Sequence, residues 1–370
     1  MSIKRIIIAH IYHPGSAATN RILAYAKGFA EVGKEVNLVL GCEKREDLPE
    51  DRQSGVVTIV DSNHNVLIRK MAKSIKELYV PGECAILVYG TPVLCRYLPK
   101  NRYDIFYECT EIPFYGKKRT IKSYIREAVK MLLARRATGM LVISQALKDY
   151  FITRGIERVE VINMFVDNSR FQNRSLENKD KYIAYCGWVS EYKDGVDCLI
   201  KAFSGFNKVY TDYKLYIIGD FISLHDKQRL EQLVNSLELG SAVVFTGKVT
   251  PEKMPEFLCS AQILALARPN NEQSRYGFPT KLGEYLATGN PVVVTDVGEI
   301  SVFLHNKQNC VIVPPNNPYE FCEALKWVVT HPKEASNIAF EGSRTVEKEF
   351  SYVTQSKKAI SFIEKCIGHP

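Results

Sequence analysis

Residues 277–295 read GFPTKLGEYLATGNPVVVT, and this stretch decides the fold class that we predict for the chain. Pro279 suits the first turn of a helix, because its ring presets φ and its missing N–H would have no partner there. The next residues favour helix, and Gly289 is a typical left-handed stop. The apolar run at 292–294 then predicts a short buried strand. The stretch therefore indicates a loop, a helix from about Thr280 and a strand of an α/β domain.

The start of this helix has the properties of a phosphate-binding site. Backbone N–H groups and the positive end of the helix dipole gather there, and Gly277 allows close approach of a ligand. Lys281 adds a positive charge in the first turn, and Glu284 can accept two hydrogen bonds from a ribose diol. We interpret the stretch as a seat for a nucleotide diphosphate. The alternative is an ordinary loop, helix and strand in which Lys281 and Glu284 form a solvated pair.

The composition is that of an ordinary globular protein with room for two domains. Of the 370 residues, 46% are hydrophobic and 24% are charged. The ten cysteines lie singly, without C-x-x-C or histidines at metal-ligand spacing, which predicts buried thiols in a reducing cytoplasm and no metal site. We find neither an export signal nor an apolar run of membrane-spanning length. We therefore expect a cytoplasmic protein.

The positive charge is concentrated in the first half of the chain. Residues 1–170 contain 27 Lys and Arg against 18 Asp and Glu, whereas the remainder contains 22 against 23. A basic lobe indicates an anionic partner, either nucleic acid or the headgroup layer of a membrane. Interleaved aromatic residues and known binding motifs are absent, so we expect no nucleic-acid partner. The charge favours a peripheral position at the inner face of a membrane.

A predicted helix at 117–136 carries much of this charge, with eight Lys or Arg and a single acid, Glu127. It would place an apolar face beside a basic stripe. The apolar face comprises Ile121, Tyr124, Ile125, Ala128 and Leu132, and the stripe comprises Lys118, Lys122, Arg126 and Lys130. Such a helix can lie on an anionic membrane surface. It can equally be a buried helix with one solvated face, and the sequence leaves both open.

The first half alternates strands and helices as a doubly wound parallel sheet does. Residues 3–12 predict the first strand, which leads into a loop containing Gly15 and Ser16. A helix follows from about Thr19 to Val32, with Thr19 as its N-cap. The loop has no G-x-G-x-x-G, which counts against a dinucleotide cofactor.

The 277–295 stretch resembles the donor-site signature of the family 4 glycosyltransferases, in the sub-pattern P-x-K-x-x-E-Y-x-A-x-G-x-P-V-V. These are retaining enzymes of the GT-B fold. The resemblance implies an α/β protein with two facing Rossmann-like, doubly wound lobes, and a C-terminal helix that crosses back to the first lobe. Residues 1–168 with 351–370 would form the acceptor-binding lobe, and 169–350 the donor-binding lobe.

The resemblance also implies a set of donor-binding residues. In many family members two glutamates stand eight apart and contact the donor sugar and the ribose. Glu284 matches the second, but Tyr276 stands at the first position, with Glu272 and Arg275 as other substitutes for it. The turn at Gly247 and Lys248 would meet the base.

The family also holds the donor diphosphate with residues on two loops. Lys193 matches a family lysine on the loop after the strand at 182–187, whereas Trp188 stands where the family has an arginine. Arg268, at the edge of another strand, could replace that arginine. Gly15 and Ser16 would approach the phosphates from the first lobe, although they can also simply make a tight turn.

The implied reaction moves a sugar from a UDP- or GDP-linked donor to an acceptor hydroxyl, with no other cofactor and with retained configuration. Lys193, Lys281 and the backbone N–H groups near Phe278 to Lys281 would stabilise the charge that grows on the β-phosphate. Phe278, Pro279 and Thr280 would be donor-binding positions. The acceptor would be a glycan or a lipid-linked intermediate of cell-surface polysaccharide or glycolipid assembly. A GT-B nucleotide-sugar epimerase and a basic, non-catalytic membrane or nucleic-acid module remain the alternatives.

Two carboxylates, Glu108 and Glu111, come at the end of a predicted strand at 103–108, where ligands collect in open α/β sheets. Glu111 is our candidate for contacting or deprotonating the acceptor hydroxyl, since a carboxylate serves as a base when its pKa and geometry suit. The alternative is a solvated loop carboxylate.

Overall fold

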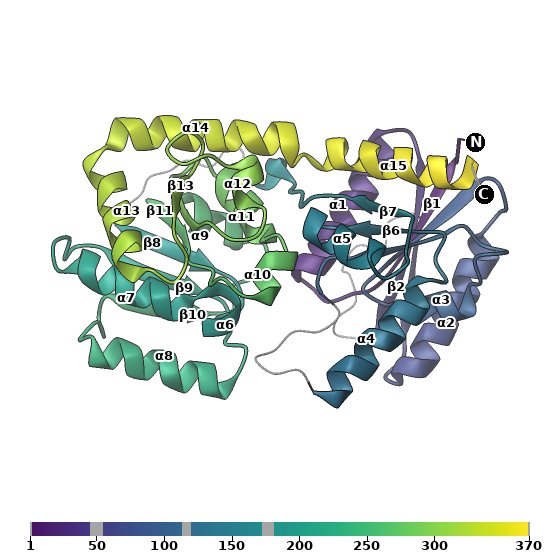
Figure 1. Cartoon of the computed structure of the whole chain (residues 1–370), viewed down its shortest axis with the longest axis horizontal. Helices are drawn as coiled ribbons and strands as arrows, with labels where there is room; N and C mark the ends of the chain where they lie inside the picture. Colours follow the sequence, from purple (N-terminus) through teal and green to yellow (C-terminus); the bar gives the residue numbers. More distant parts are fainter. Residues whose placement is uncertain (1, 45–54, 113–119, 172–180, 369–370) are drawn as a thin grey trace. The chain divides into compact units, whose positions relative to one another are not determined.

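The computed structural model describes residues 2–44, 55–112, 120–171 and 181–368 (Figure 1). The chain divides into two compact units. The first comprises Met1–Phe165 with Tyr352–Pro370, and the second comprises Val166–Ser351. In the described ranges, no helix is both long enough and apolar enough to cross a bilayer.

The first unit is built on a parallel sheet in the order β3-β2-β1-β4-β5-β6-β7. Its strands are β1 (Arg5–Ile11), β2 (Glu35–Cys42), β3 (Val56–Val60), β4 (Cys84–Tyr89), β5 (Ile105–Cys109), β6 (Gly139–Val142) and β7 (Val159–Val161). Its helices are α1 (Ala17–Glu31), α2 (His64–Leu78), α3 (Leu94–Tyr97), α4 (Ile121–Ala134), α5 (Gln145–Ile152) and α15 (Tyr352–Gly368). The central strands are continuous apolar runs because helices cover both faces of a doubly wound sheet.

The last helix of the chain belongs to this first unit, because α15 packs along α1. A Cβ at Gly28 would lie 2.2 Å from the Ser356 hydroxyl, so glycine permits the two helices to touch. Tyr352 adds a hydrogen bond to Glu31 at 2.6 Å. The predicted return of the C-terminal helix to the first lobe is therefore confirmed.

The start of α1 corrects one prediction. The N-cap is Ser16 and not Thr19, because the Ser16 hydroxyl accepts the Thr19 N–H at 3.1 Å and the helix begins at Ala17. Gly15 precedes it with a φ of 68°, a left-handed turn that favours glycine. Thr19 is buried instead, and its hydroxyl accepts the His13 N–H at 3.1 Å.

The second unit has a parallel sheet in the order β10-β9-β8-β11-β12-β13. Its strands are β8 (Tyr182–Cys186), β9 (Lys214–Ile218), β10 (Val243–Gly247), β11 (Ile263–Leu266), β12 (Val292–Thr295) and β13 (Val311–Val313). Its helices are α6 (Glu191–Asp194), α7 (Val196–Asn207), α8 (Leu224–Ser236), α9 (Met254–Cys259), α10 (Glu272–Tyr276), α11 (Thr280–Ala287), α12 (Ile300–Phe303), α13 (Pro318–Thr330) and α14 (Pro332–Glu349). A short 3₁₀ turn at Asn168–Arg170 precedes them.

The stretch at 277–295 folds as predicted. Helix α11 begins at Thr280 after Pro279, and Leu282 and Leu286 are buried on one face. Strand β12 follows and is buried along its whole length. The helix thus starts at the carboxyl edge of the sheet, where its N-terminus can contribute to a site.

Candidate functional site

The second sheet reverses its strand order between β8 and β11. Strands β9 and β10 lie on one side of this pair, and β12 and β13 lie on the other. The loops after β8 and β11 therefore diverge. In open α/β sheets, ligands bind in the crevice that such diverging loops leave at the carboxyl ends of the strands. The residues around this point form the candidate site.

The loop after β8 is held against the end of β11. Ser190 caps the short helix α6, and its hydroxyl accepts the Lys193 N–H at 3.3 Å. Gly195 ends α6 with a left-handed φ of 64°. A Cβ at Gly195 would lie 2.0 Å from the Ala267 carbonyl oxygen, so no side chain fits there. This close approach fixes Lys193 and Asp194 beside β11.

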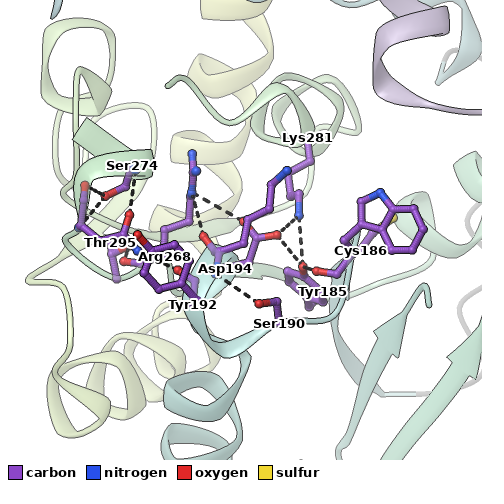
Figure 2. Close-up of polar contacts among 12 residues, drawn as sticks. Tyr185, Cys186, Ser190, Tyr192, Asp194, Arg268, Ser274, Lys281 and Thr295 are labelled. Atoms are coloured by element: carbon purple, nitrogen blue, oxygen red, sulfur yellow. Dashed lines mark hydrogen bonds and ion pairs between the residues drawn. The ribbon is translucent and has the colours of Figure 1, made fainter. Parts of the chain in front are cut away.

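Tyr185, Asp194, Arg268 and Lys281 form a buried group that we call the Asp194 cluster (Figure 2). One Asp194 oxygen accepts a hydrogen bond from Lys281 Nζ at 2.5 Å and lies 2.7 Å from the Tyr185 hydroxyl. The other oxygen lies 3.5 Å from Arg268 Nε. The side chains of Asp194 and Arg268 are 2% and 5% exposed. One carboxylate thus joins α6, α11 and the end of β11.

The Asp194 cluster contains more positive than negative charge. Burial alone would raise the pKa of Asp194, but Lys281 and Arg268 hold that pKa below its ordinary value, so the carboxylate is ionised. Burial raises the pKa of Tyr185 well above its usual range, which keeps the phenol neutral. Burial also lowers the pKa of Lys281, and the ionised Asp194 opposes that shift. Two cations share one carboxylate, which leaves one positive charge for an anionic ligand.

Lys281 lies over the carboxyl end of β8. A Cβ at Gly187 would lie 2.1 Å from Lys281 Nζ, so glycine makes room for the ammonium group. One turn later in α11, the Tyr285 hydroxyl accepts the Cys186 N–H at 2.6 Å. Because residues four apart share a helix face, this anchor directs Lys281 toward the switch point. The Lys281 side chain is 16% exposed and can be reached from solvent.

The N-terminus of α11 lies beside Lys281. Pro279 is its N-cap, and within the described ranges no side chain caps this end. Phe278 fixes the preceding loop, since its ring lies 5.7 Å from the rings of Phe303 and Phe350. Gly277 has an extended φ of −101° that any residue can adopt. The helix therefore presents the positive end of its dipole next to a lysine, which is a recurrent anion-binding arrangement.

Glu284 and Lys281 do not form the solvated pair that the sequence left open. Glu284 instead accepts a hydrogen bond from Arg170 at 2.7 Å. Tyr276 ends α10, and the Arg275 guanidinium lies 5.7 Å from its ring centre. Glu272 lies in the first turn of α10. Which of these contacts a donor sugar stays a prediction.

The other predicted donor residues lie at strand ends of the same sheet. The carbonyl of Lys193 accepts a 3.4 Å hydrogen bond from Arg268 Nε, so these two residues are neighbours. Trp188, where the family has an arginine, is 57% exposed. Gly247 ends β10 with a φ of 67°, and its carbonyl accepts the Gly219 N–H at 3.0 Å. Lys248 follows Gly247 directly, two strands away from the switch point.

Gly15, Ser16 and Glu111 belong to the first unit. Its sheet reverses order between β1 and β4, and Gly15 and Ser16 lie in the loop after β1. Glu111 follows β5, and its carbonyl accepts a 3.1 Å hydrogen bond from the Cys109 thiol. These three residues therefore occupy the carboxyl edge of the first sheet, as the Asp194 cluster does in the second.

Glu108, the other carboxylate at that edge, is completely buried. One of its oxygens accepts hydrogen bonds from Arg21 at 2.6 Å and from the Tyr25 hydroxyl at 2.9 Å. Arg21 also donates to the carbonyls of Ile162 and Asn163, both at 2.9 Å. Glu108 thus ties α1 to the ends of β5 and β7, and it is sealed from solvent.

Sequence reasoning missed Asp194 and Tyr185. Asp194 directly follows Lys193, which was singled out for its match to a family lysine. A buried lysine and arginine require a counter-charge, so a carboxylate near the loop after β8 could have been sought once Lys281 and Arg268 were both placed at the site. Tyr185 reads only as an apolar strand residue, and nothing in the sequence distinguishes its hydroxyl.

The fold is that of the GT-B glycosyltransferases, in which two α/β lobes each carry a parallel sheet. The Anabaena protein HepE, solved in complex with UDP and glucose, superposes with a TM-score of 0.77 at 17% identity, covering 98% of this chain and 100% of that one. Residues 180–331 match the family model described as "Glycosyl transferases group 1". This match lies wholly within the second unit, which contains the Asp194 cluster.

Two curated relatives agree with that match. The chain is 23% identical over 222 residues to D-rhamnosyltransferase WbpZ of Pseudomonas aeruginosa, covering 56% of this chain and 55% of the relative. It is 23% identical over 284 residues to the putative teichuronic acid biosynthesis glycosyltransferase TuaH of Bacillus subtilis, covering 70% and 68%. The chain thus spans little more than half of the first relative. These findings support the glycosyltransferase family and favour neither the epimerase nor the non-catalytic module.

Proposed function

We propose that this protein transfers a sugar from a nucleotide diphosphate sugar to an acceptor hydroxyl. The observation that carries the proposal is the unbalanced charge of the Asp194 cluster. Lys281 and Arg268 share one carboxylate at the switch point, beside an N-terminus of α11 that has no side-chain cap among the described residues. A diphosphate supplies the negative charge and the acceptor oxygens that such a place favours.

The proposed chemistry follows from the charge that develops during the reaction. As the glycosidic bond breaks, electrons move onto the β-phosphate oxygen, and the leaving group becomes more negative. Lys281, Lys193 and the backbone N–H groups near Phe278 to Lys281 stabilise that charge without rearranging. Asp194 holds the Lys281 ammonium in place, so the Lys281 side chain loses less conformational entropy when the phosphate binds. Retention is proposed to follow from attack on the face that the leaving phosphate occupies.

The remaining roles are assigned by position. Glu284 would accept the ribose hydroxyls, and Gly247 and Lys248 would meet the base. Gly15 and Ser16 would approach the phosphates from the first unit, and Glu111 would contact the acceptor hydroxyl. UDP is our first choice of carrier because UDP is the ligand named for HepE, and GDP is the second.

The acceptor is proposed to be a glycan or a lipid-linked intermediate in cell-surface polysaccharide assembly. The name of TuaH, a putative enzyme of teichuronic acid biosynthesis, and the name of WbpZ, a rhamnosyltransferase, support this choice. The donor sugar is to be identified by assay.

Thermal denaturation with UDP, GDP and ADP tests the proposal. We expect one nucleotide to raise the melting temperature, because a ligand at 100 times its Kd stabilises the folded state by about 2.7 kcal/mol. Sugars carried by that nucleotide are then offered with acceptor glycans, and the anomeric configuration of the product is read by NMR.

A matched pair of lysine variants locates the binding site. Lys281→Ala should abolish the shift in melting temperature, whereas Lys201→Ala should preserve it, since Lys201 pairs with Asp197 on α7. If no nucleotide stabilises the protein, or if Lys281→Ala binds as tightly as the unaltered chain, the proposal is wrong. An inverted product would reject the retaining mechanism alone.

A further inference from the structure

Helix α4 turns its apolar face to solvent. Its exposed apolar residues repeat at helical spacing along one face: Ile121 (81% exposed), Tyr124 (53%), Ile125 (59%), Val129 (49%) and Leu132 (57%). The opposite side of the helix packs on the unit through Met131, Leu133 and Ala134. The sequence left open whether this apolar face is buried. In the structure of the first unit, this face is exposed. We call the exposed face the α4 surface.

Cations border the α4 surface, while the acid of the helix is withdrawn from it. Lys122 and Arg126 are exposed, and Lys130 is half-buried. Glu127 is 14% exposed and faces the body of the unit, where it contacts the Tyr150 hydroxyl and lies 3.6 Å from Arg154 Nε. The solvent side of α4 therefore combines apolar side chains with positive charge. Lys118, which the sequence added to this stripe, lies outside the described residues.

A hollow of about 400 Å³ lies between α4 and the loop that precedes α3. Pro92, Val93, Ile125, Val129 and Leu133 supply its apolar lining, together with the stems of Lys122, Arg126 and Lys130. Long cationic side chains can line apolar space with their methylene groups and keep their charged ends in water. The hollow thus offers an apolar recess next to three cations.

Helix α2 is a control within the same unit. It is also basic and amphipathic, and Arg69, Lys73 and Lys76 are exposed on it. Its apolar face, however, packs on the unit, with Leu67, Ile68, Met71, Ala72 and Ile75 buried. Figure 1 shows α2, α3 and α4 as neighbouring helices. Basic charge alone therefore does not set α4 apart; the uncovered apolar face beside the charge does.

We propose that the α4 surface docks on an anionic lipid bilayer. The apolar side chains would enter the headgroup boundary, and Lys122, Arg126 and Lys130 would face the lipid phosphates. A second copy of the chain fits less well, because a two-fold contact would bring the three cations of each copy together. An anionic membrane satisfies both halves of the surface, the apolar residues and the charge.

Co-sedimentation with vesicles tests the proposal. The full chain is mixed with phosphatidylcholine vesicles that contain 30% phosphatidylglycerol, and separately with pure phosphatidylcholine vesicles. We expect binding to the anionic vesicles and at least tenfold weaker binding to the neutral ones. Lys122→Gln with Arg126→Gln and Lys130→Gln should weaken binding on the order of 100-fold, at roughly fivefold per charge.

Two further variants separate the contribution of the apolar side chains from that of the positive charge. Ile121→Ser with Ile125→Ser and Leu132→Ser should abolish binding and leave the melting temperature nearly unchanged, because these side chains are exposed. Arg69→Gln with Lys73→Gln and Lys76→Gln removes the same charge from α2, and we expect at most a small decrease. An α2 variant that loses as much binding as the α4 variant would reduce the effect to net charge and overturn the proposal.

Sedimentation velocity tests the alternative that a second copy of the chain covers the α4 surface. We expect a sedimentation coefficient that is the same for the unaltered chain and for the Ile121, Ile125 and Leu132 variant. If the unaltered chain is a dimer that this variant converts to monomers, and neither binds vesicles, the α4 surface is a contact between copies and the membrane proposal is wrong.

Discussion

The carboxyl edges of the two sheets each bury an ion pair, and the two pairs are built differently. In the first unit, Arg21 and Glu108 are 2.6 Å apart and are 3% and 0% exposed. In the second, Lys281 and Asp194 are 2.5 Å apart and are 16% and 2% exposed. The first pair is balanced and sealed, whereas the second is joined by Arg268 and is open on the lysine side.

The difference distinguishes a pair that is fully enclosed from a pair that can still interact with an anion. All three nitrogens of the Arg21 guanidinium are engaged, since two carbonyls and Glu108 accept four hydrogen bonds from it. No charge is left there for a ligand. Around Asp194 two cations compete for one carboxylate, so the cluster gains when an anion arrives. The degree of burial and the charge balance, not the presence of an ion pair, are therefore our grounds for proposing that the second edge binds the phosphate.

The largest expected effect is on stability, at the sealed pair. Glu108→Ala leaves the Arg21 guanidinium buried without a counter-charge, which should cost about 3 to 5 kcal/mol of folding free energy. Calorimetry should show a large drop in the melting temperature of the first unit. The double variant Arg21→Met with Glu108→Leu removes both charges and should recover most of the loss. A single variant that melts within two degrees of the unaltered chain would contradict the structural role.

The next effect is on activity, at the open pair. Lys281→Ala should lower kcat/KM by a factor that corresponds to about 2 to 4 kcal/mol of lost transition-state stabilisation, as for other preorganised charge stabilisers. The fold should survive, because Arg268 remains to balance Asp194. Activity and circular dichroism are measured together, with Lys201→Ala as the control. A folded Lys281 variant with full activity would remove Lys281 from the mechanism.

Local signals in the sequence predicted much of the second unit. Pro279 placed the start of α11, and the apolar run at 292–294 placed β12, because both signals depend on neighbouring residues. The same reasoning failed by three residues at α1, where both Ser16 and Thr19 are good caps. In the structure Ser16 is the N-cap, and the left-handed turn at Gly15 comes directly before it. Two equivalent caps within one turn cannot be ranked without the loop geometry.

The ion pairs could not be predicted, because they depend on long-range packing. Asp194 and Lys281 are separated by 87 positions, and Arg21 and Glu108 by the same number. The sequence identified Lys281 as a cation near a helix start, but the partner that it offered, Glu284, pairs with Arg170 instead. Likewise, the pattern of α4 defined an apolar face and a basic stripe, yet only the packed unit shows that the apolar face is uncovered.

The edge of the first sheet should also respond to pH. His10 is buried there beside Tyr89, with ring centres 5.4 Å apart, and burial lowers its pKa to about 4. A histidine with a depressed folded pKa stabilises the fold above its unfolded pKa of about 6.5 and loses that contribution as the pH falls toward 4. About 2 kcal/mol should be lost between pH 7 and pH 5.

Urea denaturation of two variants at these pH values measures this contribution. His10→Gln should remove most of the difference between pH 7 and pH 5, although it lowers stability at pH 7 through lost packing. His225→Gln should leave the difference unchanged, since His225 is exposed on α8 of the second unit. If the His10 variant keeps the full pH dependence, the acid sensitivity arises from other groups.

The smallest expected effect is at an ion pair that has the same residue types as Arg21 and Glu108 but is partly exposed. Arg170 and Glu284 are also an arginine and a glutamate, 2.7 Å apart, but they are 28% and 21% exposed. Because water screens a pair of this kind, Arg170→Ala should cost no more than about 1 kcal/mol of stability, against about 3 to 5 kcal/mol at Glu108.

If Glu284 accepts the ribose hydroxyls, losing Arg170 should raise KM by a few-fold with little change in kcat, as the carboxylate loses its orientation. A stability loss equal to that of Glu108→Ala would mean that burial does not distinguish the two edges. An unchanged KM would separate Glu284 from the ribose.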